Sequence, residues 1–401
     1  MSGQPAMLEE ISFVVGEPDL PGEDLPVLEW FDPDVIDLLS SLSAAILAAP
    51  GSRSFPDLIT FAFWSRRAAL AEARTAYRDG GLSLGRGVAF HIAPGNVPLM
   101  FAYSLVIGLL SGNANIVRLP SKPSVQGDLL CSELRRLLAD DRYRRLAPYV
   151  RCVSYDHAAC QGSRIFSRIC DVRVIWGGDA TIDRIRQEPL KASAVDIVFF
   201  DRYSMAFIDA DSWLAANDKP RLINGFYNDA FISDQLACSA PRYVVWTGAR
   251  VDEAREDFWS LLHSEVKARY PLGEAVAVAK WEHLCRLGAN HQSLRLQSHD
   301  NHIVRLWSEE IRPALVVGHP GGGLFIESRA ERLEDCAPLL GRGCQTLVYH
   351  GVPPHAIRDF LARVGPRGVD RAVPMGQALD FSLVWDGYDT VRALSRKVMI
   401  A

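Results

Sequence analysis

The chain has 401 residues, of which 48% are hydrophobic and 23% are charged, and its formal net charge is −5 at pH 7. This composition is typical of a globular protein and excludes a long disordered or low-complexity chain. Two domains are expected, because a single hydrophobic core rarely grows beyond about 250–300 residues. The acidic balance, with no block of Lys or Arg, argues against a nucleic-acid partner.

The eight cysteines and the apolar runs bear on the compartment. The cysteines form no CxxC pair and show no Cys/His spacing of a metal site. With no signal peptide in the sequence, they are expected to be reduced thiols of a cytoplasmic protein. The longest apolar run, 97–110, contains Pro98 and is shorter than the roughly 20 residues that a membrane-spanning helix needs. It is expected to be a buried helix, and no membrane span is predicted.

The first half of the chain predicts two helices followed by a regular alternation of strands and helices. An acidic, proline-containing stretch precedes a helix at 34–48, and the apolar spacing indicates one amphipathic helix over 56–77. Strands are then expected at 88–92, 115–119, 150–155, 172–176 and 197–200, with helices between them at 98–110, 125–138, 158–169 and 180–187. Apolar strands separated by helices are typical of a parallel sheet covered on both faces.

The second half predicts a further α/β domain. Strands are expected at 242–246, 302–306, 314–317 and 344–349, and helices at 252–268 and 274–286. The fold class is therefore expected to be α/β, with a doubly wound parallel-sheet cofactor domain and a second α/β domain that is catalytic. The expected parts are an N-terminal extension at 1–75, a cofactor-binding domain at 76–206, a catalytic domain at 207–372 and a C-terminal segment at 373–401 that packs back on the body.

Three loops that follow strands of the first half are candidates for cofactor contacts. No GxGxxG follows the first strand, which argues against the ordinary dinucleotide fingerprint. In the third loop, a Gly-Gly turn opens a helix and is expected to leave backbone N–H groups free for a phosphate. The candidate contacts are Pro94, Gly95, Arg118, Pro120, Ser121, Lys122, Trp176, Gly177 and Gly178. Lys122 suits a phosphate on the adenine ribose, with Arg118 close behind; the alternative is that both are solvated surface charges.

Cys238 is the candidate nucleophile. It stands on a Ser/Ala/Pro turn directly before the strand expected at 242–246. At such a junction a thiol can meet substrate while its own backbone N–H helps to form an oxyanion hole. The alternative is a buried structural cysteine. Further along, the glycine-rich residues 318–323 look like a phosphate cradle, but a loop between strands is the preferred interpretation.

Four segments, 91–98, 109–122, 234–241 and 376–387, together resemble the acyl-CoA reductase family typified by the bacterial bioluminescence fatty acid reductase (LuxC-like). The resemblance runs from about residue 63 to residue 396, and the combination of motifs is more specific than any one of them. That family is similar to the aldehyde dehydrogenase superfamily. The resemblance implies a nicotinamide-binding domain, a catalytic domain that holds the cysteine, and a homo-oligomer.

The same resemblance implies roles for individual residues. Cys238 matches the family's nucleophile, and Asn96 matches the asparagine whose amide serves the oxyanion hole. Lys122 stands where the superfamily has a glutamate that holds ribose hydroxyls, and an ammonium there favours a 2′-phosphate, hence NADPH. Residues 176–178 match the turn near the pyrophosphate. The superfamily's hydrolytic glutamate should fall around 199–203, where this sequence has none.

The resemblance and the missing glutamate together imply NADPH-dependent reduction of an acyl thioester to the aldehyde through an S-acyl-Cys238 intermediate. The donor is expected to be acyl-CoA or an acyl carrier protein. Bioluminescence reductases pass acyl groups between partner proteins, but the sequence assigns no surface to such a partner. Two alternatives are an NAD(P)-dependent aldehyde dehydrogenase that forms the acid and a non-catalytic subunit that binds an acyl carrier. No residue that activates Cys238 can be named from the sequence.

Overall fold

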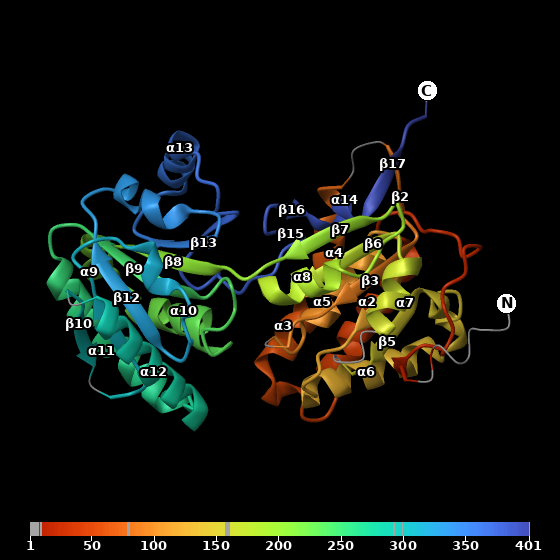
Figure 1. The fold of residues 1–401 in the computed structure, drawn as a ribbon, viewed down its shortest axis with the longest axis horizontal. Coiled ribbons are helices and arrows are strands. Elements are labelled where there is room, and N and C mark those ends of the chain that lie inside the picture. The colour runs from red at the N-terminus through yellow and green to blue at the C-terminus, as the bar shows by residue number, and fades with distance from the viewer. Residues whose placement is uncertain are drawn as a thin grey trace. The chain divides into compact units, whose positions relative to one another are not determined.

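A computed structural model describes residues 8, 10–77, 81–95, 97–156, 161–291, 293–298 and 300–400. By its internal contacts the chain divides into two compact units (Figure 1). Unit 1 comprises residues 1–200 and 381–401, and unit 2 comprises residues 201–380. The chain therefore passes between units at 200/201 and 380/381, where the sequence suggested 206/207 and 372/373.

Unit 1 is built on a six-stranded sheet with the order β1-β5-β4-β3-β6-β7. Its parallel strands are β3 (Val88–Ile92), β4 (Ala114–Arg118), β5 (Val150–Ser154), β6 (Val172–Trp176) and β7 (Val195–Phe199). They lie within two residues of their expected positions, which confirms the doubly wound parallel sheet. The edge strand β1 (Ser12–Val15), which the sequence did not predict, runs antiparallel to β5.

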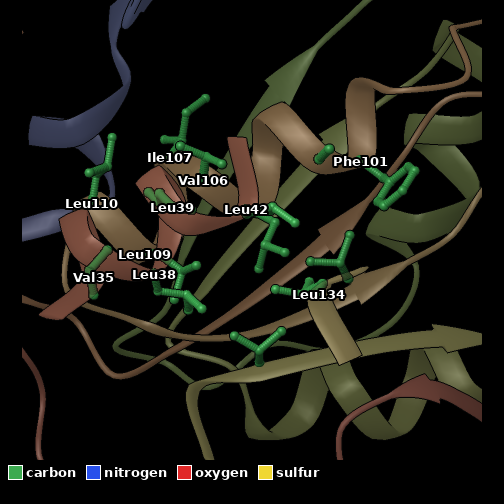
Figure 2. Packing of buried hydrophobic residues seen from close by; sticks show 14 of the residues in the cluster. Val35, Leu38, Leu39, Leu42, Phe101, Val106, Ile107, Leu109, Leu110 and Leu134 are labelled. Carbon is green, nitrogen blue, oxygen red and sulfur yellow. The ribbon is translucent and has the colours of Figure 1, made fainter. Parts of the chain in front are cut away.

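Helices cover both faces of this sheet. They are α2 (Pro33–Ala48), α3 (Pro56–Trp64), α4 (Arg67–Thr75), α5 (Met100–Leu110), α6 (Val125–Leu138), α7 (Gln161–Ile169) and α8 (Asp179–Arg186). Figure 2 shows leucines and valines of α2 and α5 meeting Leu134 of α6 in one core cluster. Successive residues of β3 alternate between the two faces, so Ala89 belongs to this cluster while Phe90 packs against Phe166 in another. Of the helices described, none is both long and apolar enough to cross a bilayer.

The single helix expected over 56–77 is two helices. The chain leaves the helical conformation at Arg66, whose backbone is extended with φ −67° and ψ 153°. The Ser65 hydroxyl donates to the Phe61 carbonyl (2.9 Å) at the end of α3. This break lets Phe61 and Trp64 pack against Tyr103 of α5, so tertiary packing overrides a continuous helical pattern.

Hydrogen bonds between buried polar side chains connect β6, α5, β3 and β4 in unit 1. Trp176 Nε1 donates to Ser104 Oγ (3.0 Å), which contacts His91 Nδ1 (2.7 Å), while His91 Nε2 contacts Asn115 Oδ1 (3.0 Å). Because Asn115 Oδ1 can only accept, the His91 proton lies on Nε2, and Nδ1 accepts the Ser104 hydroxyl. Gly108 makes room for this pair, since a Cβ there would lie 1.8 Å from Asn115 Oδ1.

His91 should make stability fall in acid. Complete burial lowers the pKa of His91 to about 4. Between pH 6.5 and 4 the unfolded chain therefore binds a proton that the folded chain excludes, so stability is lost as the pH falls through this window. Urea titrations at pH 6.5 and 4.5 should show a loss of unfolding free energy about 2 kcal/mol smaller in His91→Gln than in wild type. Equal losses in both proteins would contradict a neutral His91.

Unit 2 is built on a seven-stranded sheet with the order β10-β11-β12-β9-β8-β13-β14. Its strands are β8 (Tyr203–Asp209), β9 (Pro241–Thr247), β10 (Arg295–Ser298), β11 (Val304–Trp307), β12 (Leu324–Arg329), β13 (Cys344–His350) and β14 (Arg371–Pro374). All are parallel except the edge strand β10. The helices are α9 (Ala210–Leu214), α10 (Lys219–Phe231), α11 (Val251–Arg269), α12 (Glu274–Asn290) and α13 (Pro354–Val364). This confirms a second α/β domain.

The strand expected at 314–317 is wrong. Residues Pro313–Val316 form a short 3-10 helix, and the strand of this region is β12. The pattern of β12 is obscured by Glu327, a fully buried carboxylate in its middle. That charge is held by Arg255 (2.9 Å) and by the indole N–H of Trp259 (2.7 Å), which lie far away in sequence. A paired carboxylate can be buried in a strand, but no residue near Glu327 in the sequence indicates that it is paired.

The last residues of the chain return to unit 1. They form β15 (Val384–Trp385), β16 (Tyr388–Asp389), α14 (Thr390–Ala393) and β17 (Ser395–Val398), and β17 pairs with β2 (Leu82–Gly85). Phe381 packs against Trp64 and Tyr103 with ring centroids 5.4 and 4.7 Å apart. These contacts order the C-terminal aromatic residues against the body of unit 1.

Candidate functional site

Cys238 lies in unit 2 on the turn that leads into β9. The turn is closed by the Ala240 N–H donating to the Ala237 carbonyl (3.0 Å), and the chain enters the strand at Pro241. This confirms the predicted junction of turn and buried strand. Cys238 is partly exposed, whereas Cys131, Cys152, Cys170, Cys336 and Cys344 are buried. The thiol is therefore neither a core residue nor a fully solvated one.

Two residues shortly before the Cys238 turn adopt a strained backbone conformation. Asp234 and Gln235 have φ of 53° and 58°, a region that side-chain-bearing residues occupy at a cost of about 1–3 kcal/mol. The buried Gln235 amide donates to the carbonyls of Pro241 (2.9 Å) and Leu324 (2.8 Å) and accepts the N–H groups of Gly323 (3.0 Å) and Leu324 (3.2 Å). All four hydrogen-bonding positions of the amide are used, so the turn before Cys238 has one rigid shape.

The glycine-rich residues 318–323 support this turn. The Gly322 N–H donates to the Asp234 carbonyl (2.8 Å), and the N–H of Gly323 is used by Gln235. Gly321, Gly322 and Gly323 all have positive φ, which a larger side chain would strain. The buried Lys280 ammonium donates to the Gly322 carbonyl. The preferred interpretation as a connecting loop is confirmed, because these N–H groups serve the protein instead of a phosphate.

Side chains on β13 and β8 form hydrogen bonds with Cys238 itself. Gln345 Nε2, on β13, donates to Cys238 Sγ at 3.1 Å. Ser204 Oγ, on β8, donates to the Cys238 carbonyl (2.7 Å) and accepts the Thr346 N–H (3.0 Å). Sequence reasoning missed Gln345 and Ser204. The one available signal was a Gln-Thr pair at the start of an otherwise apolar strand.

The sheet is irregular on both sides of Ser204. On one side, Cys344 pairs with Tyr203 but Leu347 pairs with Met205, so β13 carries one extra residue across Gln345 and Thr346. On the other side the register shifts between Ser204 and Met205, and β9 carries one extra residue at Arg242. Bulges of this kind re-aim side chains next to functional sites.

Arg242 brings a positive charge to the same place. Its side chain is buried, and its Nε has no hydrogen-bond partner among the residues that the structure describes. Burial lowers the pKa of Arg242, while the negative charges of Asp201 and of the Cys238 thiolate raise it. Arg242 lies four residues after Cys238, at the bulge of β9 beside Ser204, whose hydroxyl holds the Cys238 carbonyl.

Residues 201–203, where the sequence lacks the superfamily's glutamate, are tied into unit 2. Arg202 forms an ion pair with Asp370 and donates to the Cys344 carbonyl (2.6 Å). Asp201 is exposed, and its carboxylate acts on the charge of Arg242. This part of the segment thus shapes the surroundings of Gln345 and Arg242.

The motif at 376–380 packs on α10, the helix that precedes the Cys238 turn. The buried Asp229 carboxylate accepts the N–H groups of Gly376 (2.6 Å) and Ala378 (2.8 Å). Gly225 lies against Gly376, where an added Cβ would come within 2.9 Å of the Gly376 Cα. Burial raises the pKa of Asp229 to about 7. The motif at 376–380 and helix α10 therefore pack together within unit 2.

In unit 1 the predicted cofactor residues lie at the carboxyl ends of neighbouring strands. Arg118 ends β4; it is buried, donates to Ser121 Oγ (3.3 Å) and lies over the Tyr155 ring at 4.9 Å. The alternative of a solvated surface charge is therefore wrong for Arg118. Lys122 and Ser121 are exposed, and Pro120 is partly buried.

The turn after β6 differs from expectation because one of its backbone N–H groups is not free. The Gly177 N–H donates to the Phe199 carbonyl (3.1 Å), so it is not available for a phosphate. Trp176 stacks on Phe199 with ring centroids 3.7 Å apart, and its indole N–H goes to Ser104. Gly178 precedes α8, whose first residue, Asp179, is acidic.

The sheet order places these loops at a switch point. The chain runs outward from β3 through β4 to β5 and then returns to β6 on the other side of β3. Ligands of doubly wound folds bind where the order reverses in this way, at the carboxyl ends of the strands. Pro94 and Gly95 follow β3 at this point, while Asn96 lies outside the described residues.

Comparison with solved structures identifies the fold. Methylmalonate-semialdehyde dehydrogenase (DddC) from Oceanimonas doudoroffii superposes with a TM-score of 0.65 at 13% identity, over 92% of this chain and 86% of that one. Lactaldehyde dehydrogenase from Escherichia coli superposes with a TM-score of 0.64 at 12% identity, over 92% and 87% of the two chains. The fold is that of the aldehyde dehydrogenases.

Sequence comparison identifies the family. The chain is 22% identical over 322 residues to a long-chain acyl-protein thioester reductase from Vibrio harveyi. The match covers 78% of this chain but 63% of the curated relative's length, so the chain spans less than two thirds of that protein. The profile of the acyl-CoA reductase (LuxC) family matches residues 62–301, more than half of the chain. The chain therefore belongs to the LuxC family of acyl-CoA reductases.

Proposed function

We propose that the protein reduces an acyl thioester to the aldehyde through an S-acyl intermediate on Cys238. The observation that carries this proposal is the rigid turn that holds a partly exposed thiol just before the start of β9, in a chain of the LuxC family. A cysteine thiolate attacks acyl carbons readily, and a turn of one shape keeps the attack geometry constant.

In the proposed reaction the Cys238 sulfur forms a bond to the acyl carbon, and the bond from that carbon to the donor's thiol breaks. The donor is acyl-CoA or an acyl carrier protein. The Cys238 backbone N–H and, from the family resemblance, the Asn96 amide stabilise the oxyanion, each donor contributing roughly 3–4 kcal/mol in comparable acyl-transfer sites. We also propose that the protein forms a homo-oligomer and that a partner protein transfers acyl groups to or from it.

The nicotinamide cofactor is proposed to be NADPH, held by unit 1. Two features support it: the buried Arg118 has an Nε without a partner among the described residues, and Lys122, four residues further along the chain, is exposed. A guanidinium and an ammonium suit a 2′-phosphate. Pro94, Gly95, Pro120, Ser121, Trp176, Gly177 and Gly178 are proposed as further contacts. The buried Trp176 would contribute backbone atoms, and Gly177 would contribute atoms other than its N–H, which Phe199 accepts. When bound, NADPH supplies the hydride that converts the acyl thioester to aldehyde.

The proposal can be tested by intact-protein mass after mixing the protein with acyl-CoAs and acyl carrier proteins in the absence of NADPH. A gain of one acyl mass is expected on wild type and on Cys285→Ala, which removes an exposed thiol, but not on Cys238→Ala. Addition of NADPH should remove the adduct and release aldehyde. No adduct from either donor class, or an adduct that survives in Cys238→Ala, would contradict the proposal. Release of acid instead of aldehyde would favour the aldehyde dehydrogenase alternative.

Lys122→Glu should reverse the coenzyme preference. The change removes an ammonium and restores a carboxylate, which repels a 2′-phosphate and accepts ribose hydroxyls. The ratio of kcat/KM for NADPH over NADH is expected to fall by about 10²-fold. Steady-state kinetics with both coenzymes measures this ratio, and Lys397→Glu, the same charge change at an exposed position on β17, is the matched control. Similar ratios in the two variants would exclude Lys122 from the phosphate site.

A further inference from the structure

The structure places two groups near Cys238 for which the proposed mechanism has no role. Gln345 donates an amide N–H to Sγ at 3.1 Å. Arg242 is the extra residue at the bulge of β9, beside Ser204, whose hydroxyl donates to the Cys238 carbonyl. The side chains of Gln345 and Arg242 are both buried, and each belongs to a stretch of strand that bulges beside Ser204. The two irregularities in the sheet thus lie on either side of Ser204, the residue that holds the Cys238 carbonyl.

The orientation of the Gln345 amide is determined by its neighbour. Thr346 Oγ1 donates to Gln345 Oε1 (3.2 Å), which leaves the NH₂ end of the amide toward the sulfur. Thr346 is itself fully buried, and its N–H is held by Ser204, the residue that also holds the Cys238 carbonyl. The donor and the thiol are therefore connected through one network of buried hydrogen bonds.

A hydrogen-bond donor and a positive charge both favour the thiolate over the thiol. The thiolate is the nucleophilic form of cysteine. A carboxamide differs from the imidazole of most cysteine enzymes in that it accepts no proton at neutral pH. Gln345 can thus stabilise the sulfur without offering a base that would activate water against an acyl-enzyme.

We propose that Gln345 is a catalytic residue that stabilises the Cys238 thiolate by N–H donation, and that the buried positive charge of Arg242, at the start of β9, assists it electrostatically. The reaction this serves rests on the proposed function. The thiolate electron pair forms the bond to the acyl carbon, the donor's C–S bond breaks, and the departing thiolate takes a proton from solvent. No oxidation state changes in this step.

The test measures the thiolate directly and needs neither acyl substrate nor NADPH. Iodoacetamide is reacted with the full chain across pH 5 to 10, and the labelling rates of Cys238 and Cys285 are followed by peptide mass spectrometry. Cys285 is exposed on α12 and serves as the reference within each sample. In wild type the midpoint of the Cys238 profile is expected below that of Cys285.

Gln345→Met, close in size but without an N–H donor, is expected to raise the Cys238 midpoint by about one pH unit, and Arg242→Met by a similar amount. Gln345→Glu, which sets a like charge beside the sulfur, should raise it further, while Arg242→Lys should leave it near the wild-type value. The Cys285 midpoint should not move in any variant. Thermal melting identifies a variant that fails to fold, and four variants at two positions keep the test decisive if one does.

A Cys238 midpoint that is unchanged in Gln345→Met and Gln345→Glu would overturn the proposal for Gln345, and an unchanged midpoint in Arg242→Met would overturn it for Arg242. The failure of the proposed function gives a different result. In that case the Cys238 midpoint would respond to the variants as expected, but no acyl group would transfer to wild type.

Discussion

Cys238→Ala is expected to abolish aldehyde formation, lowering kcat by at least about 10⁴-fold, because no covalent acyl intermediate can form. The alanine variant should still fold. The turn at 237–240 is held by backbone groups, and the hydrogen bond from Ser204 reaches the carbonyl of residue 238, which alanine retains. A change in unfolding free energy within about 1 kcal/mol is therefore expected. Aldehyde release, NADPH oxidation and urea denaturation measure the two effects.

Cys285→Ala is the matched control for this experiment, because Cys285 is exposed and lies on α12 outside the network around residue 238. It should retain wild-type activity. If Cys238→Ala kept activity within tenfold of wild type, the chain would act without this nucleophile. That outcome would favour a subunit that binds an acyl carrier while another residue or protein performs the chemistry.

Gln345→Glu is expected to change the product from aldehyde toward acid. The carboxylate would stand about 3 Å from the sulfur, at the place where the amide now donates its N–H. There it can take a proton from a water molecule that adds to the acyl carbon, after which the carbon–sulfur bond breaks and acid and thiol are released. Aldehyde yield per acyl group should fall at least about tenfold, at the low end of what a positioned general base contributes.

The product change can be separated from a loss of nucleophilicity. Gln345→Met should acylate more slowly, because the donor is gone, but should release no acid from the adduct it forms. Acid and aldehyde are counted after a single turnover of acylated protein, in water enriched with oxygen-18, so that label in the acid identifies hydrolysis. If Gln345→Glu yielded aldehyde alone, then the lack of a base at position 345 would not explain why the acyl-enzyme escapes hydrolysis.

Parallel strands and the turn at Cys238 were predictable because their signals are local. Apolar runs such as Val172–Trp176 are buried on both faces, and a Ser/Ala/Pro turn before a strand needs no distant partner. β12 was not predictable in the same way, because Glu327 interrupts its apolar pattern and is neutralised by Arg255, which lies on α11. The break between α3 and α4 likewise depends on packing of Trp64 against Tyr103.

The sequence by itself determined the α/β class, the family and the candidate nucleophile, since each rests on residues that are neighbours along the chain. Only the tertiary structure decided what surrounds that nucleophile. Gln345 is separated from Cys238 by 107 positions and reaches it because β13 and β9 flank β8 in one sheet, with a bulge on either side of Ser204. Strand order and bulges arise from pairing between distant segments, and no local pattern of residue types encodes them.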